Sequence, residues 1–239
     1  MRYAIHPRDA SPATEGGADV QSLFGAERGC DAFEQRVLRF ADGAAAPRRD
    51  DARDELLYVL EGSGRLRVDG DDRPLAAGTA VFVASGTTWS VEAEGGLTAL
   101  SVLVPDPVGA GTTHAVVDLA AGSEHGATAG RAFLLGACPD VGCASATQFV
   151  GLIPPGRAPD HFHTYDEVIY VLEGEGRLEI DGEQEPVGPG SCIHLPARTV
   201  HCLANPGAGE LRVLGVFRPA GSPAEAYYPD GTPAAVPDE

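Results

Sequence analysis

Apolar and polar residues alternate in short runs along most of this chain, and Gly or Pro bounds nearly every run. The runs "EVIYVLEG" (167–174) and "GRLEIDG" (176–182) are rich in β-branched and aromatic residues, and a glycine-bearing tight turn joins them. Three more runs follow at 190–197, 199–207 and 210–219. Because no long stretch has the 3.6-residue period of an amphipathic helix, the pattern predicts an all-β fold.

The first half of the chain carries the same pattern, in runs at 33–40, 56–62, 64–70, 78–85, 88–96 and 97–105. The segment "DELLYVLEGSGRLRVDGDDRPLAAG" (54–78) aligns without a gap with "DEVIYVLEGEGRLEIDGEQEPVGPG" (166–190), at an offset of 112 residues. Fourteen of the 25 aligned positions are identical. A repeat this long indicates a duplicated domain, so we expect two tandem copies of one small sandwich or barrel.

The copies meet in a stretch rich in Gly, Ala and Thr, in which "HAVVDLAA" (114–121) predicts a short strand or a helical turn. We therefore expect four parts, which are an N-terminal barrel (1–108), a linker or crossover (109–130), a C-terminal barrel (131–219) and a tail (220–239). The tail is Pro-rich and acidic, and we expect it to form a lid or a frayed end.

Composition narrows the classes of partner. The net charge is −18, from 35 acidic and 17 basic residues, which argues against nucleic acid and anionic membranes. No apolar run approaches the ~20 residues of a membrane helix, and the N-terminus lacks the apolar core of a secretory signal, so we predict a cytoplasmic location. All 17 basic residues are Arg, which excludes Schiff-base chemistry on Lys. Five cysteines without a C-x-x-C pair predict buried thiols.

The stretch "HFHTYDE" (161–167) carries the candidate chemistry. In an extended segment His161 and His163 point to the same side, which is the spacing needed to chelate one ion. Glu167 opens the next predicted strand and offers a carboxylate, and His201 is the natural candidate for a fourth donor. Nitrogen and carboxylate donors suit one divalent transition metal, Fe, Mn, Ni, Co or Zn, and leave coordination positions open for substrate.

Two motifs here resemble those of the cupin superfamily. "GRAPDHFHTYDEVIYVLEG" (156–174) resembles the first motif, although the family usually has five residues between the glycine and the first histidine and this chain has four. "GSCIHLPARTVHCLAN" (190–205) resembles the second, with Arg198 where the family usually has glycine. The resemblance implies a bicupin, which is two double-stranded β-helix (jelly-roll) barrels. It also implies a metal held by His161, His163, Glu167 and His201.

The first copy departs from this pattern at the ligand positions. Arg49, Asp51 and Trp89 stand where the second copy has His161, His163 and His201, and only Glu55 matches Glu167. One carboxylate does not hold a catalytic metal, so we expect the N-terminal barrel to bind none. We expect Trp89 and Phe82 to fill its interior, and Glu55 to pair with Arg49 or Arg53.

Three further residues are candidates for contact with a substrate. Arg198 lies three residues before His201 and either holds a substrate carboxylate or belongs to a surface turn. Tyr170 is shared with the first copy as Tyr58, which favours packing over catalysis. His194 aligns with Phe82 and is a pocket residue or a strand residue of the core.

Several functions remain open, because the cupin fold hosts many. The resemblance favours a dioxygenase acting on a small organic acid or aromatic substrate, with Glu167 as the catalytic base. A metal-dependent hydrolase or isomerase is the first alternative. Ureidoglycine aminohydrolases are similar bicupins, but their ligands follow a different order. A non-catalytic binding or sensing protein is the second alternative. We expect a small-molecule partner, and a monomer or a homodimer.

Overall fold

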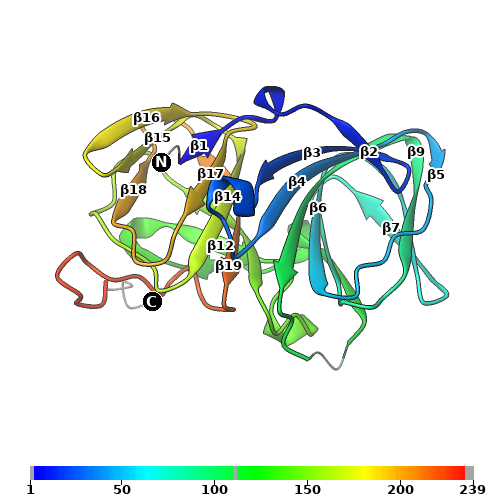
Figure 1. Cartoon of the computed structure of the whole chain (residues 1–239). Helices are drawn as coiled ribbons and strands as arrows, with labels where there is room; N and C mark the ends of the chain where they lie inside the picture. The colour runs from blue at the N-terminus through cyan, green and yellow to red at the C-terminus, as the bar shows by residue number, and fades with distance from the viewer. Residues whose placement is uncertain (1–2, 110–111, 235–239) are drawn as a thin grey trace. The chain divides into compact units, whose positions relative to one another are not determined.

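The computed structural model describes residues 3–109 and 112–234, and its regular structure is almost entirely strand (Figure 1). The chain forms two compact units. The N-terminal unit holds Pro7–Ala121 together with Gly136–Ala146. The C-terminal unit holds Met1–His6, Gly122–Leu135 and Thr147–Glu239. The predicted all-β fold is confirmed.

The strands and 3₁₀ turns of the N-terminal unit are, in chain order, η1 (Pro7–Asp9), β2 (Ala13–Glu15), β3 (Ala18–Phe24), η2 (Ala26–Arg28), β4 (Glu34–Phe40), β5 (Gly43–Ala44), β6 (Arg53–Val68), β7 (Asp71–Ala76), β8 (Thr79–Val83), β9 (Trp89–Pro105), β10 (His114–Asp118), η3 (Leu119–Ala121) and η5 (Pro139–Val141). Over the described residues they form an antiparallel sheet in the order β10-β8-β6-β9-β4-β3-β2, with β5 on β9 and β7 on β6. The predicted short strand or helical turn at 114–121 is confirmed in both forms, as β10 followed by η3.

The C-terminal unit contains β1 (Ala4–Ile5), β11 (His125–Gly126), η4 (Thr128–Gly130), β12 (Ala132–Leu135), β13 (Thr147–Ile153), β14 (Asp166–Glu173), β15 (Gly176–Ile180), β16 (Glu183–Val187), β17 (Cys192–Leu195), β18 (His201–Ala204) and β19 (Leu211–Arg218). Among the residues described, two sheets form, in the orders β1-β17-β14-β19-β13-β12-β11 and β16-β15-β18. Strand β14 is an interior strand of the larger sheet, and Glu167 pairs with Leu195 of β17 on one side and with Phe217 of β19 on the other.

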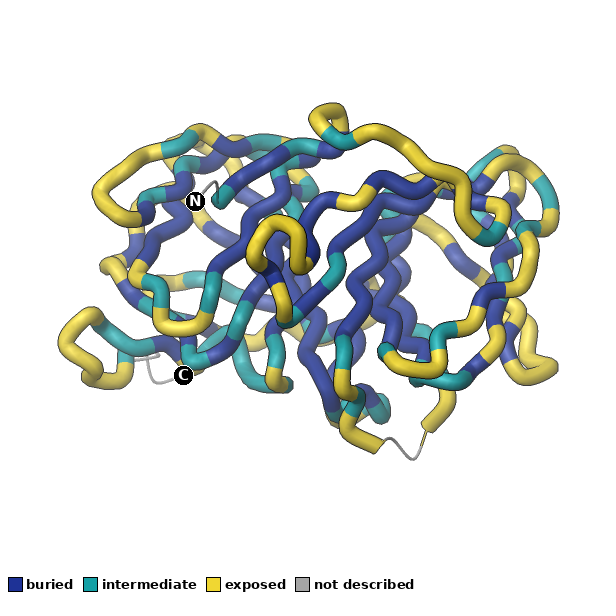
Figure 2. Tube along the Cα trace, in the orientation of Figure 1, coloured by how far each residue is buried: buried dark blue, intermediate teal, exposed yellow. Residues whose placement is uncertain are grey.

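Strand alternation builds a separate apolar core in each unit. Successive side chains of a strand point to opposite faces, so alternate residues enter the core. In the C-terminal unit Ile169 and Val171 of β14 pack with Ile193 and Leu195 of β17. Figure 2 shows buried residues running along the strands and exposed residues in the connections. In the N-terminal unit the corresponding core contains Trp89, which is 2% exposed.

The predicted tight turns between paired runs are wrong in both copies. In the N-terminal unit the two runs form one long strand, β6, with irregularities at Val59/Glu61 and Gly62/Ser63. In the C-terminal unit β14 and β15 join different sheets. The glycines mark a close approach of two strands, because a Cβ on Gly62 would lie 2.2 Å from the carbonyl oxygen of Gly96, and one on Gly174 would lie 2.7 Å from that of Glu210.

The structure also places the domain boundaries differently from the predicted ones. Strand β1, from the predicted N-terminal barrel, pairs with β17 in the C-terminal unit. Residues 136–146, from the predicted C-terminal barrel, belong to the N-terminal unit, where the Ser145 hydroxyl donates to the Asp54 carboxylate at 2.7 Å. The predicted linker contains β10, which pairs with β8. Segments this short carry no periodicity, so the sequence pattern does not show which sheet receives them.

The five cysteines are buried thiols, as their odd number predicts. Within residues 3–109 and 112–234, no helix is long and apolar enough to cross a membrane.

Candidate metal centre

Main-chain hydrogen bonds hold the three candidate histidines in place. His161 and His201 form an antiparallel bridge in which the N–H of His161 donates to the His201 carbonyl at 3.1 Å and the N–H of His201 donates back at 2.9 Å. His201 opens β18, whereas His161 lies in the segment before β14. The carbonyl of His163 accepts the N–H of Arg198 at 2.8 Å. The backbone thus joins the two motifs that are separate in the sequence.

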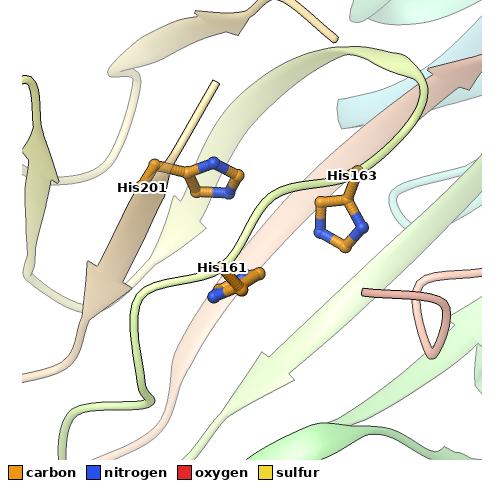
Figure 3. Close-up of side chains that lie close together, drawn as sticks. All are labelled: His161, His163 and His201. Atoms are coloured by element: carbon orange, nitrogen blue, oxygen red, sulfur yellow. The ribbon is translucent and has the colours of Figure 1, made fainter. Parts of the chain in front are cut away.

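The three side chains converge on one point (Figure 3). Candidate ligand atoms of His161, His163 and His201 all lie within 4.8 Å of one another. Each Nδ1 lies near a backbone carbonyl oxygen, that of Pro159 at 2.9 Å, Glu225 at 2.8 Å and Thr199 at 2.8 Å, respectively. A carbonyl only accepts, so each Nδ1 carries the proton and each Nε2 keeps its lone pair. This is the arrangement in which protein imidazoles bind a metal.

Burial keeps these imidazoles neutral. The three residues are 5%, 8% and 5% exposed. Desolvation lowers the pKa of His161 to about 4, and lowers the pKa values of His163 and His201. Metal ions bind the neutral form of histidine, so all three are ready to bind at neutral pH.

Glu167 lies on the wall of the same cavity. It is 5% exposed, at the start of β14, and desolvation raises its pKa to about 8, while the charge of Arg131 acts in the opposite direction. Its carboxylate oxygens lie outside the group of atoms within 4.8 Å of one another. The structure therefore assembles three of the four predicted ligands, and Glu167 as a ligand stays a prediction.

The cavity has a volume of about 70 Å³ and is mostly apolar. Beside the four predicted ligands, its lining consists of Ala127, Thr128, Arg131, Ala132, Phe133, Phe149, Gly151, Ile153, Ile169, Leu203, Val213, Phe217 and Pro223. Three convergent Nε2 lone pairs with a buried carboxylate nearby fit a divalent transition metal. The small volume favours a ligand of few atoms.

Sequence reasoning missed Arg131. Its Nη2 donates to the Leu203 carbonyl at 2.7 Å, and its charge acts on Glu167 and on all three histidines. Burial lowers its pKa from 12.5, but a guanidinium stays protonated at neutral pH. No motif marks this residue, which lies at the edge of the predicted linker. A weak signal was available, since Arg131 is the only basic residue between Arg73 and Arg157 apart from histidine.

Sequence reasoning also underestimated the tail. Its described residues do not fray, and their role as a lid stays a prediction. Pro223 lines the cavity, Glu225 orients His163, and Tyr227 exchanges main-chain hydrogen bonds with Phe162 at 2.9 and 3.0 Å. Residues 235–239 lie outside the described residues.

The three predicted substrate residues lie elsewhere. Arg198 is exposed in a turn with φ of 64°, a conformation that explains why glycine is usual at this position. Tyr170 and His194 each stand beside residues of the apolar core, so strand alternation points their side chains to the opposite face of the sheet. Within the described part of the chain, none of the three lines the cavity. Their roles in substrate binding stay predictions.

In the N-terminal unit, other residues stand at the positions of the three histidines. Trp89 enters its core as expected, and Phe82 is fully buried too, but on the opposite face of β8 from Val81 and Val83, which pack in the core with Trp89. The expected partner of Glu55 is also wrong. Glu55 is 5% exposed and accepts a hydrogen bond from Arg36 Nη2 at 3.0 Å. A guanidinium thus neutralises this carboxylate in the copy that has lost the histidines.

Two segments of the chain, residues 36–104 and 149–217, match the cupin domain. The chain belongs to the cupin family. Because it carries two matched domains, it is a bicupin, as the sequence motifs predict.

Curated relatives match shorter stretches of this bicupin. Quercetin 2,3-dioxygenase of Bacillus subtilis is 44% identical over 46 residues, which is 19% of this chain and 14% of that protein. L-ectoine synthase of Bordetella petrii is 33% identical over 82 residues, 34% of this chain and 61% of that protein. Polyketide synthase CurC of Streptomyces cyaneus is 28% identical over 101 residues, 41% of this chain and 66% of that protein. The bicupin therefore spans less than two thirds of each relative, and these relatives include enzymes.

Solved structures match nearly the whole chain. The protein Ylba of E. coli superposes with a TM-score of 0.76 over 90% of this chain and 89% of its own, at 15% identity. A variant of oxalate decarboxylase from Bacillus subtilis superposes with a TM-score of 0.74 over 92% of this chain and 78% of its own, at 15% identity. At this identity the likeness shows the shared fold alone.

Proposed function

We propose that this bicupin is a metal-dependent enzyme that acts on a small organic acid in its C-terminal barrel. One observation carries the proposal, which is that three Nε2 lone pairs converge inside a buried cavity that Arg131 also lines. A metal held by His161, His163, His201 and Glu167 would bring Lewis acidity and, for a redox-active ion, reactivity toward O₂.

The chain's own residues set up the rest of the chemistry. Arg131 is fixed by the Leu203 carbonyl, and its remaining N–H groups can hold a substrate carboxylate. Phe133, Phe149 and Phe217 line the cavity and exclude water, which strengthens this charge pairing. Glu167, with a pKa near 8, exchanges a proton near neutral pH and so suits a general acid or base.

Dioxygenase chemistry is the form of the reaction that we favour. It is supported by the three-histidine site and by the short match to quercetin 2,3-dioxygenase. The buried, apolar cavity suits a reaction that must exclude water. We propose a cytoplasmic protein with a small-molecule partner, as a monomer or a homodimer.

Hydrolase or isomerase chemistry is the second candidate, and the raised pKa of Glu167 favours it. Proton transfer by a carboxyl group needs no O₂, and the metal would act only as a Lewis acid. The match to L-ectoine synthase shows that relatives of this chain include enzymes other than dioxygenases.

The deciding experiment uses protein purified without a histidine tag. Elemental analysis first gives the metal and its stoichiometry. The protein is then loaded with Fe(II) and incubated with small carboxylic acids, and O₂ uptake and substrate loss are recorded. O₂ uptake coupled to substrate loss supports the dioxygenase. Turnover that survives strict anaerobiosis and replacement of Fe by Zn supports the second candidate instead. Tight binding of an acid that is never converted would contradict both and indicate a binding protein.

A further inference from the structure

The N-terminal unit contains a second cavity, of about 220 Å³, in which arginines gather. Its lining consists of Glu15, Gly16, Arg36, Pro47, Arg48, Arg49, Asp50, Arg53, Glu55 and Leu103. Four of these residues are arginines and three are carboxylates, and Asp51 and Glu34, outside the lining, pair with Arg49 and Arg53. Arg49 and Glu55 align with His161 and Glu167, so this cavity includes positions that carry the metal motif in the other copy.

Arg36 contributes a buried guanidinium with unused donors. Its side chain is 4% exposed, and its Nη2 donates to Glu55 at 3.0 Å and to the Ser101 hydroxyl at 3.2 Å. Its Nε has no hydrogen-bond partner among the described residues. The carboxylate oxygens nearest its Nη1 belong to Glu15, at 3.6 Å, and Glu34, at 4.0 Å, both beyond good hydrogen-bond distance. A buried cation with unsatisfied N–H groups favours an anion.

Arg48 contributes a second buried guanidinium to this cavity. Its side chain is 7% exposed and lies over the Trp89 ring, 5.6 Å from the centroid. Its Nη2 donates to the Glu15 carboxylate at 2.9 Å and its Nη1 to the Glu15 carbonyl at 2.8 Å. Its Nε, like that of Arg36, has no hydrogen-bond partner in the part of the chain described. Packing and hydrogen bonding therefore fix this guanidinium.

Glu15 shows which chemical group fits between the two arginines. One oxygen of its carboxylate lies 2.9 Å from Arg48 Nη2 and 3.6 Å from Arg36 Nη1. The side chain is 59% exposed, and it belongs to β2, whose three residues are all exposed. An exposed carboxylate can return to water at little cost, whereas the buried arginines cannot.

We propose that this cavity is a binding site for a small organic carboxylate, and that Glu15 occupies the position of the ligand's carboxylate when no ligand is present. With Glu15 displaced, the four arginines of the lining lie beside four carboxylates, which are Glu34, Asp50, Asp51 and Glu55. This balance suits a singly charged carboxylate better than a phosphate dianion, which the four remaining carboxylates would repel more strongly. The proposal does not depend on the metal centre or on the proposed reaction.

The test is a titration of the full-length, metal-free protein with acetate at constant ionic strength, followed by calorimetry and NMR, with acetamide as the neutral control. We expect weak binding by the wild type. The Glu15→Gln variant should bind about tenfold more tightly if Glu15 fills the site about nine-tenths of the time, because the internal competitor is removed.

Variants locate the bound acetate. Arg48→Lys keeps the charge but loses the planar fork, and it should weaken binding in the Glu15→Gln background. Arg73→Gln is the matched control, since Arg73 is an exposed arginine of the same unit that pairs with Asp71, and it should change nothing. Arg131→Gln removes the arginine of the metal cavity and should also leave this binding intact. Thermal unfolding checks that each variant is folded.

Three results would overturn the proposal. The first is the absence of acetate binding by both wild type and Glu15→Gln, which would leave the arginines as an ion-pair network only. The second is binding that is lost in Arg131→Gln and kept in Arg48→Lys, which would assign the acetate to the metal cavity. The third is equal weakening by Arg73→Gln, which would indicate nonspecific charge attraction.

Discussion

The imidazole of His163 donates its Nδ1–H to the backbone carbonyl of Glu225 at 2.8 Å, although 62 residues separate the two positions. Glu225 is held in turn by the Tyr165 hydroxyl, which donates to its carboxylate, and by the neighbouring Tyr227, which bonds the backbone of Phe162. The tail thus orients a candidate metal ligand, and its carbonyl sets which nitrogen of His163 faces the cavity.

Removing the tail should therefore weaken metal binding. A chain that ends at Ser222 loses the carbonyl of Glu225, and we expect its metal affinity to fall about 10- to 100-fold, which is typical when the hydrogen-bond partner of a ligand is lost. Competition with a chelator of known affinity measures this change. Tyr227→Phe removes only a hydroxyl that donates to the Glu225 carboxylate at 3.1 Å, and it should bind metal as the wild type does. Equal affinity of the truncated and full-length proteins would show that the tail has no role in the site.

His163→Ala should abolish stoichiometric metal binding while the fold survives, because the first copy of the domain folds with Asp51 at this position. The matched control is His114→Ala, which removes a histidine of the N-terminal unit that lies 3.4 Å from Asp71. Elemental analysis and circular dichroism check both variants. Retention of stoichiometric metal by His163→Ala would refute the ligand set.

Glu167 can be tested through the proton that it carries. Burial raises its pKa to about 8, so most molecules are protonated there at pH 7, whereas the histidines are already neutral. If Glu167 binds the metal, loading should release nearly one proton in the wild type and almost none in Glu167→Gln. Calorimetry in buffers of different ionisation enthalpy counts these protons. The same proton release from both proteins would exclude Glu167 as a ligand.

The same shift predicts how the stability of the metal-free protein depends on pH. An unfolded glutamate titrates near 4.5, and the folded one near 8. Between these values the folded state keeps a proton that the unfolded state loses, so this group's contribution to the free energy of unfolding falls as pH rises. In Glu167→Gln the side chain does not titrate, so this fall in the free energy of unfolding is absent. Denaturant unfolding should therefore show that the free energy of unfolding of the variant rises relative to that of the wild type from pH 5 to pH 8. Above pH 8 the difference should change little. A constant difference across this range would contradict the shift.

Arg131→Gln should weaken binding of a carboxylate at the metal centre by about 10- to 100-fold, the cost of losing a charged hydrogen bond. Metal stoichiometry should not change, because the guanidinium is not a metal ligand. A cobalt-substituted protein, titrated with acetate and followed by its visible spectrum, measures this binding without requiring turnover. Arg198→Gln, at the exposed turn, is the control. Weaker acetate binding by Arg198→Gln than by Arg131→Gln would show that Arg198, not Arg131, binds the carboxylate.

Local patterns were sufficient to predict most of the site. His161 and His163 stand two residues apart, and the second motif supplies His201, so the residues that converge could be named from their spacing. The internal repeat added a comparison, because Arg49, Asp51 and Trp89 show that the fold does not require the imidazoles. The tight turns between strands were misjudged for a physical reason, since glycine permits both a hairpin and a close approach of two strands.

The sequence by itself determined the all-β class, the duplication, the cupin resemblance and the three histidines, because each depends on residues close together along the chain. Only the tertiary structure showed Arg131 in the cavity wall, Glu225 behind His163 and Arg36 beside Glu55. Each of these residues comes from a segment far from the motif that it serves. Their meeting depends on how the sheets assemble, and strand periodicity carries no information about which distant segments become neighbours.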